Sequence, residues 1–267
     1  METKEFFPEG WKVDHNLITK EDLVNSLQTG EILEAKVQRC DLQCNLHFQF
    51  ENGLTGIIPK QKVELEDGKK ENPKKYFGKV NKVLQFVVTD VNQADDTQFF
   101  LSRVEVEDQV KKWIQEDLQE GQILNGIVRS MKPYGVFVEI AGGVVGLLHI
   151  EDISIGRIRE PEERFSIGQK IKVMVKSINR RDQQVILTYK ELLGTWEENV
   201  EKIKEGQILP GIVREKEKNR NGIFIELMPN LIGLAEYREN LNYGTKVKVY
   251  VKKIQREKKK IKLIVIE

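Results

Sequence analysis

One segment occurs three times along the chain, and this repetition constrains the fold more than any other feature. Residues 121–129 read GQILNGIVR, and residues 206–214 read GQILPGIVR. A weaker copy, GEILEAKVQ, occupies residues 30–38. Self-similarity of this kind indicates that one structural unit has been copied. We therefore expect three similar units, rather than the two domains that a chain of 267 residues would otherwise suggest.

Each copy is followed by the same succession of short strands. Alternating strands are predicted at residues 46–50, 136–140 and 223–227, and each is followed by a glycine ten residues after its first residue, at Gly56, Gly146 and Gly233. A strand pair ends each unit, at 83–91 and 98–104, at 170–178 and 184–189, and at 246–254 and 260–266. Five short strands in about 70 residues are typical of a small OB-type barrel. The sequence therefore predicts an all-β protein of three tandem five-stranded OB-fold barrels.

Short amphipathic helices are predicted to join these barrels. The expected order is an N-terminal segment with a short helix (1–29), a first barrel (30–104), a linker helix (105–118), a second barrel (119–191), a linker helix (192–205) and a third barrel (206–267). Thr19 and Thr195 each begin a capping box. The apolar positions are Leu23, Val24 and Leu27 in the first helix, Val106, Val110, Trp113 and Ile114 in the second, and Trp196, Val200 and Ile203 in the third. We expect the two linker tryptophans to anchor helices on barrels rather than to contact a ligand.

The stretch from Lys132 to His149 contains the main candidate site. From Val136 to Ile140 the sequence alternates, so Val136, Val138 and Ile140 are expected to face the core, with Phe137 and Glu139 on the opposite face. Tyr134 lies at a Pro-Tyr-Gly bend that can turn its ring toward Phe137. Gly142-Gly143 predicts a tight hairpin, after which the returning strand ends at His149. Two aromatic rings and an imidazole would then meet on one patch, the kind of surface on which unpaired bases stack.

The second unit resembles a known domain. GIVR at 126–129, YGVFVEI at 134–140, GLLHI at 146–150 and GQKIKVMV at 168–175 are similar to the RNA-binding domain repeated in bacterial ribosomal protein S1, which also occurs in exoribonucleases and initiation factors. The similarity covers nearly all of the second unit, is weaker over the third and first, and leaves about the first twenty residues outside it. The resemblance implies an RNA-binding protein built from such domains.

The family pattern has two aromatics, a histidine, an Asp and an Arg, and the second unit matches it in part. The resemblance implies Tyr134, Phe137 and His149 as RNA contacts, whereas Asn179 and Gln184 occupy the positions of the Asp and the Arg. That change removes a charge-assisted phosphate contact. Arg180 and Arg181 in the same turn are candidates to replace it, and Lys132 is a further candidate RNA contact.

The other two units depart further from the pattern. The third unit keeps Phe224, but Asn221 and Glu236 stand at the tyrosine and histidine positions. The first unit has Cys44, His47 and Pro59 at the three positions, so its family binding face is expected to be lost. Net charge also differs: residues 204–267 carry 15 basic and 8 acidic side chains, a net of +7, whereas residues 1–118 carry 16 and 22, a net of −6. The C-terminal unit alone therefore has the charge that polyphosphate binding favours.

Several classes of function are disfavoured by the sequence. Its longest apolar windows are too short for a membrane span, and the N-terminus has no apolar signal region, so a cytoplasmic location is expected. Cys40, Cys44 and His47 form C-x3-C-x2-H without a fourth ligand, which disfavours a metal site. Phosphate-binding loops, nucleophile elbows and HExxH motifs are missing, so we predict no enzyme and no cofactor.

Single-stranded RNA is therefore the predicted partner, with messenger RNA and the ribosome as candidates and with translation or RNA metabolism as the setting. The alternative is a protein-interaction adaptor that docks on the ribosome or on an RNA-processing complex through the acidic first unit. The sequence predicts no oligomeric state.

Overall fold

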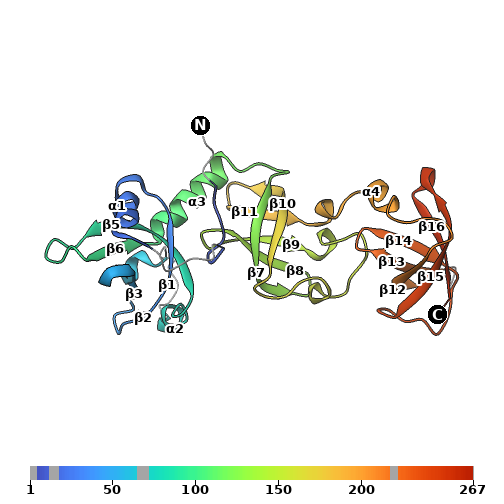
Figure 1. Cartoon of the computed structure of the whole chain (residues 1–267), viewed down its shortest axis with the longest axis horizontal. Coiled ribbons are helices and arrows are strands. Elements are labelled where there is room, and N and C mark those ends of the chain that lie inside the picture. The colour runs from blue at the N-terminus through green and yellow to red at the C-terminus, as the bar shows by residue number, and fades with distance from the viewer. Residues whose placement is uncertain (1–4, 12–17, 65–71, 217–221, 267) are drawn as a thin grey trace.

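The computed structural model describes residues 5–11, 18–64, 72–216 and 222–266 and contains three β-sheets in a row along its long axis (Figure 1). The second unit is a closed barrel with strand order β10-β11-β9-β8-β7, and the third is a closed barrel with order β12-β13-β14-β16-β15. In both, the third and fifth strands pair in parallel and the other neighbours are antiparallel. The predicted fold of tandem OB barrels is thus confirmed.

The strand bounds follow the sequence pattern closely. In the second unit they are β7 (Ile123–Lys132), β8 (Gly135–Ala141), β9 (Val144–His149), β10 (Lys170–Asn179) and β11 (Gln184–Thr188). In the third unit they are β12 (Ile208–Lys216), β13 (Ile223–Met228), β14 (Leu231–Ala235), β15 (Lys246–Gln255) and β16 (Lys260–Val265). Short 3₁₀ turns occur at η1 (Glu51–Gly53), η2 (Lys60–Lys62), η3 (Ile150–Asp152), η4 (Pro161–Glu163), η5 (Lys190–Leu193) and η6 (Arg256–Lys258).

The first unit differs from the predicted five-stranded barrel, because over its described residues it forms a six-stranded sheet that is not closed. Its strands are β1 (Leu33–Lys36), β2 (Arg39–Cys40), β3 (Leu46–Gln49), β4 (Thr55–Ile58), β5 (Val83–Val91) and β6 (Gln98–Ser102), in the order β1-β5-β6-β4-β3-β2. The two edge strands are consecutive in the chain. Val37 donates its N–H to the Lys82 carbonyl (2.9 Å), and Gln38 donates to the His47 carbonyl (2.9 Å). The chain between β1 and β2 therefore passes from one edge of the sheet to the other, where the other units have one continuous strand.

The helices are α1 (Lys20–Thr29), α2 (Pro73–Phe77), α3 (Val104–Glu116) and α4 (Trp196–Val200). The capping boxes predicted at Thr19 and Thr195 are both present. All four apolar positions of α3 are buried, whereas in α1 only Leu23 is buried, and Val24 and Leu27 are exposed. Of the three apolar residues named in this helix, Leu23 therefore supplies the packing contact. None of the described helices is long and apolar enough to cross a membrane.

The repeated glycines allow two strands to approach closely inside each barrel. A Cβ added to Gly56 would lie 2.5 Å from Leu101, one on Gly146 would lie 2.7 Å from Leu187, and one on Gly233 would lie 2.5 Å from Leu263. In each unit the partner is a buried leucine of the last strand, so a larger residue would clash with that side chain and require it to shift.

An N-terminal segment and an Arg–Glu pair with a buried carboxylate join the first two units. Arg129 Nε donates to Glu139, and Arg129 Nη2 donates to the Glu9 carbonyl (2.6 Å). Glu9 donates its N–H to Glu139 (2.7 Å) and accepts from Arg103 Nε of the first unit (2.8 Å). Burial and the neighbouring Glu9 raise the pKa of Glu139, against the effect of Arg129. Glu139 lies on the outer face, as its alternation predicts, but the segment covers it and it is not exposed.

The same pair recurs between the second and third units. Arg214 Nε donates to Glu226 (2.7 Å), and this carboxylate also accepts from Arg164 Nη2 of the second unit (2.6 Å). Both members of the Arg214–Glu226 pair are buried. The corresponding residues of the first unit are Gln38 and Gln49. An outer-face Arg–Glu pair is therefore the point at which each of the later barrels meets the part of the chain before it.

Candidate nucleic-acid interface

Strand register brings the three main candidate residues of the second unit together. Gly135 of β8 pairs with His149 of β9, and Phe137 pairs with Leu147, so Phe137, Leu147 and His149 share the outer face. Tyr134 lies in the turn just before β8, and its carbonyl accepts from the Ile150 N–H (2.9 Å). The ring centroids of Tyr134 and Phe137 are 6.1 Å apart at an interplanar angle of 82°. The two rings therefore form one edge-to-face cluster but offer two separate stacking faces.

The exposure of these side chains suits contact with a ligand. Tyr134 is 50% exposed, and the His149 side chain is 43% exposed. His149 Nδ1 accepts a long hydrogen bond from the Glu151 N–H (3.4 Å). Because Nδ1 acts as acceptor, the neutral ring carries its proton on Nε2, where it can be donated to a ligand oxygen.

Lys132 lies in the same row as His149. It pairs with Gly135 across β7 and β8, and its side chain is exposed. Asp152, just beyond His149, is buried and accepts from Lys176 Nζ (2.7 Å) and Lys190 Nζ (2.8 Å). Burial alone would raise the pKa of Asp152, but these two lysines outweigh it and hold the pKa below its usual value. Two of the lysines near the patch are therefore already neutralised, whereas Lys132 is available.

The turn between β10 and β11 is closed by its own polar groups. Asn179 Nδ2 donates to Asp182 (2.7 Å), and the Asp182 N–H donates back to Asn179 (3.2 Å). Gln184 and Arg181 are exposed, and Arg181 makes no ion pair or hydrogen bond with any described residue. Strand β11 pairs in parallel with β9, and Ile186 pairs with Leu147. Gln184 lies two residues before Ile186, so the turn lies at the opposite end of the face from His149.

Arg180 has a different role from the one expected of a phosphate contact. Its Nη1 donates to the carbonyls of Ile114 and Gln115 (both 2.5 Å), and its Nη2 donates to the carbonyl of Leu118 (2.9 Å). These carbonyls lie at or just after the C-terminal end of α3, where a cation is favoured by the helix dipole. The structure thus brings Tyr134, Phe137, His149 and Lys132 together and directs Arg180 elsewhere.

The third and first units keep less of the pattern. Phe224 lies on the outer face of β13, paired with Leu234, and Glu236 is exposed. Asn221 falls outside the described residues. In the first unit His47 binds Asp41 (2.8 Å), and although burial opposes it, this contact together with those from Asn45 lowers the pKa of Asp41 to about 2. The described part of the chain contains no His, Cys, Asp and Glu group arranged to hold a metal.

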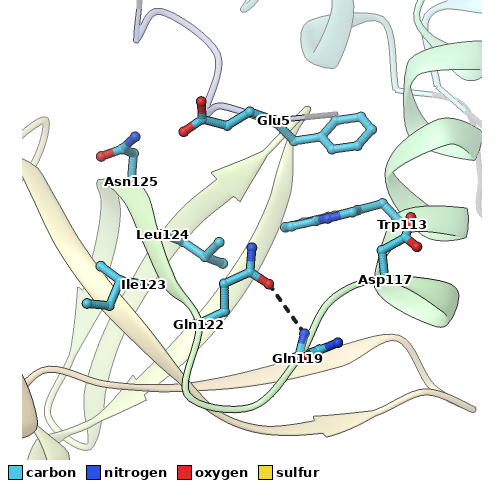
Figure 2. Close-up of a pocket in the computed structure, with 9 residues that line it drawn as sticks. Glu5, Trp113, Asp117, Gln119, Gln122, Ile123, Leu124 and Asn125 are labelled. Carbon is cyan, nitrogen blue, oxygen red and sulfur yellow. Dashed lines mark hydrogen bonds between the residues drawn. The ribbon is translucent and has the colours of Figure 1, made fainter. Parts of the chain in front are cut away.

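A cavity of about 460 Å³ between the N-terminal segment, α3 and the second barrel differs from the outer face of that barrel in its lining residues (Figure 2). Trp113 forms one wall, and Gln119 donates its N–H to Gln122 at the edge (3.4 Å). Glu5 and Asp117 also line it. Two carboxylates and the buried position of Trp113 make this cavity unsuitable for a phosphate backbone.

Comparison with known proteins agrees with the geometry. The family model for the S1 RNA-binding domain matches residues 117–190. A curated relative, the small ribosomal subunit protein bS1 homolog of Bacillus subtilis, is 30% identical over 258 residues, which cover 91% of this chain and 65% of the relative. By this match the second unit of the chain is an S1 RNA-binding domain. The chain as a whole resembles the bS1 homolog and spans a little under two thirds of its length.

Two further proteins resemble this chain. The 4-hydroxy-3-methylbut-2-enyl diphosphate reductase of Clostridium acetobutylicum is 32% identical over 232 residues, which cover 80% of this chain but 35% of the reductase. A solved multidomain protein with nucleic acid binding domains from Streptococcus pneumoniae matches 89% of this chain and 73% of that chain at 11% identity and a TM-score of 0.27, which is too distant to support an argument.

Sequence reasoning did not find the residues that join the units. Arg103, Glu9 and Arg164 each belong to one unit or segment and donate a hydrogen bond to a carboxylate of another. A signal for the pair itself was present in the sequence. Arg129 and Arg214 end the same repeated motif, and Glu139 and Glu226 each stand three residues after the first residue of the predicted strands 136–140 and 223–227. Repeated charges in otherwise apolar strands point to buried partners.

Proposed function

We propose that the chain is a non-enzymatic protein that binds single-stranded RNA, with bases stacked on the outer face of the second unit. The observation that carries this proposal is the cluster of Tyr134, Phe137 and His149, three groups from separate positions that converge on one exposed patch of an S1 domain. A flat aromatic face suits any base, so little sequence preference is expected from it.

The proposed mechanism divides the RNA contacts by chemistry. One base stacks on Tyr134 and a second on Phe137, and the Nε2–H of His149 donates to a sugar, base or phosphate oxygen. Lys132 and Arg181 would attract the phosphates on either side, one at each end of the face. Gln184 and the exposed atoms of Asn179 offer neutral hydrogen bonds at the second end, and Arg180 is left to cap α3.

The third unit would add affinity through its charge and Phe224. Two stacked bases at about 1–3 kcal/mol each give weak binding by themselves. A neighbouring barrel on the same RNA strand acts at a high effective concentration. The buried Arg214–Glu226–Arg164 junction supports this, because it connects the two barrels directly.

We also propose translation as the setting, because the bS1 homologues are ribosomal proteins by name. The ribosome and messenger RNA are proposed partners on the same ground. The named activity of the reductase is not transferred, since this chain matches 35% of that protein. One observation supports the alternative of a protein-interaction adaptor. The first unit is acidic and lacks the aromatic residues of the second unit's patch.

Fluorescence anisotropy with a labelled single-stranded RNA oligonucleotide tests the proposal. Phe137→Ala is expected to weaken binding about 5- to 150-fold, the range that corresponds to one stacked base. Trp113→Phe is the matched aromatic control and should leave affinity unchanged, because Trp113 is buried between α3 and the second barrel. Equal losses in the two variants would contradict the assigned face, and no affinity in the wild type would favour the adaptor.

A further inference from the structure

A pocket of about 650 Å³ lies where the second unit, α4 and the third unit meet. Its walls come from three separate elements: Ile155 of the second unit, Trp196 of α4, and Phe224 with Leu234 of the third barrel. The volume is within the usual range for sites that enclose a small ligand or part of a larger one. It is therefore a hollow rather than the open strand face seen in the second unit.

The position of Ile155 is set by direct hydrogen bonds between the units. Its N–H donates to Asn230 Oδ1 (3.1 Å), and the next residue, Gly156, donates to the Pro229 carbonyl (2.8 Å). Asn230 is itself buried and donates to the Lys190 carbonyl (2.6 Å). The hairpin between β13 and β14 thus holds the loop of the second unit in place. Ile155 nevertheless remains 52% exposed, so its side chain is accessible to a ligand in the pocket.

The aromatic walls are only partly covered. Phe224 and Trp196 are both partly exposed, and they line the same pocket. The indole Nε1 of Trp196 is buried and has no hydrogen-bond partner among the residues that the structure describes, so the exposed part of this side chain is carbon surface of the ring. Trp196 packs against the core of the third barrel, but its ring is not fully covered and its N–H is unpaired within the described residues.

The rim of the pocket is strongly basic. Lys258, Lys259, Lys260 and Lys262 line it, and Lys262 pairs with Leu234 in the parallel β14–β16 register. Lys259 binds Glu197 (2.7 Å), whereas Lys258, Lys260 and Lys262 make no ion pair within the described ranges. Apolar aromatic walls with unpaired lysines at the edge match a flat base flanked by phosphates.

We propose that this pocket encloses one nucleobase of the bound single-stranded RNA, with Trp196 and Ile155 as base contacts and with Lys260 and Lys262 on the adjoining phosphates. The inference rests on the proposed function, since it assigns a second contact to the same RNA strand. It adds two residues outside the family pattern, and it makes one base site depend on the junction between two units.

Fluorine NMR of the full chain labelled with 5-fluorotryptophan tests this proposal. The chain contains three tryptophans, and the Trp196 signal is assigned with Trp196→Phe. Addition of a single-stranded RNA oligonucleotide should shift the Trp196 signal and leave the Trp113 signal in place. Ile155→Glu should abolish that shift and weaken RNA affinity about five-fold or more. Ile167→Glu is the matched control, because Ile167 is also an exposed isoleucine of the second unit and does not line the pocket.

The outcomes separate the inference from the proposed function. If the RNA binds but the Trp196 signal does not move, or if Ile155→Glu binds as Ile167→Glu does, the base pocket is refuted and RNA binding on the second unit stands. If a poly-glutamate peptide shifts the Trp196 signal as strongly as RNA, the pocket recognises acidic chains, and the assignment to a base is refuted. If no RNA binds to the wild type, both proposals fail.

Discussion

Replacement of Glu226 by Gln is expected to destabilise the third unit strongly. The side chain of Glu226 is 4% exposed and that of Arg214 is 3% exposed. The carboxylate accepts from Arg214 Nε at 2.7 Å and from Arg164 Nη2 at 2.6 Å. A glutamine keeps the shape but removes the charge, so two guanidinium groups at a buried site lose their shared partner.

The magnitude follows from the burial of the pair. Loss of one member of a buried ion pair costs about 3–5 kcal/mol, because the remaining charge is left uncompensated. Arg214 keeps a second carboxylate, that of Glu163, and Arg164 is 15% exposed, so the lower end applies. We expect the free energy of unfolding of the third unit to fall by about 3 kcal/mol.

Hydrogen exchange read by mass spectrometry provides the assay, because it reports the opening free energy of each barrel separately in a multidomain chain. The matched control is Glu215→Gln. Glu215 also accepts from an arginine of the second unit, Arg157, at 3.1 Å, but the two side chains are 43% and 78% exposed. An exposed pair is worth about 0–1 kcal/mol. Equal effects of the two substitutions on the amides of β12 and β13 would refute the argument from burial.

Three further predictions concern charge. The logarithm of RNA affinity should fall with the logarithm of salt concentration. Lys132→Ala should make that slope less steep by about 0.7, the value for one phosphate of a single strand, whereas Phe137→Ala should leave the slope unchanged. Arg180→Ala should lower stability by about 1 kcal/mol in thermal or urea unfolding, through the uncapped end of α3, and should leave RNA affinity unchanged. Asp152→Asn should be less stable than wild type at neutral pH, and an acid titration should show this difference disappear as pH falls below 3.8. The reason is that a carboxyl group with a lowered pKa stabilises the fold only while it is ionised. An unchanged salt slope for Lys132→Ala would contradict the first expectation, and a loss of RNA affinity for Arg180→Ala would contradict the second. A stability difference for Asp152→Asn that does not depend on pH would contradict the third.

Local patterns were sufficient to predict the barrels. The predicted strand 170–178 is β10 to within one residue, and the alternation around Phe137 correctly places that ring on the outer face. Local patterns did not reveal that Glu139 is buried, because its cover comes from Glu9, 130 residues earlier in the chain. Such contacts depend on tertiary packing, which strand periodicity does not describe.

The directions in which long side chains point could not be predicted from the sequence either. Arg180 follows the last residue of β10, and its position in a turn is compatible with either a phosphate contact or the α3 carbonyls. The split between β1 and β2 was missed for a related reason, since the weak first copy of the repeat gave no sign of where its strand would break. Trp196 was predicted only as an anchor, because a helical apolar stripe does not show which part of a ring stays uncovered.

Photo-crosslinking of the full chain to a single-stranded RNA oligonucleotide that contains 4-thiouridine tests the central claim most directly. After digestion, mass spectrometry identifies the residues that lay against the bases. Crosslinks at Tyr134 or Phe137 are predicted, with the pocket residues of the third unit as a second group. Crosslinks confined to the first unit, or to α3 beside Trp113, would contradict the assignment of the RNA site to the outer face of the second barrel.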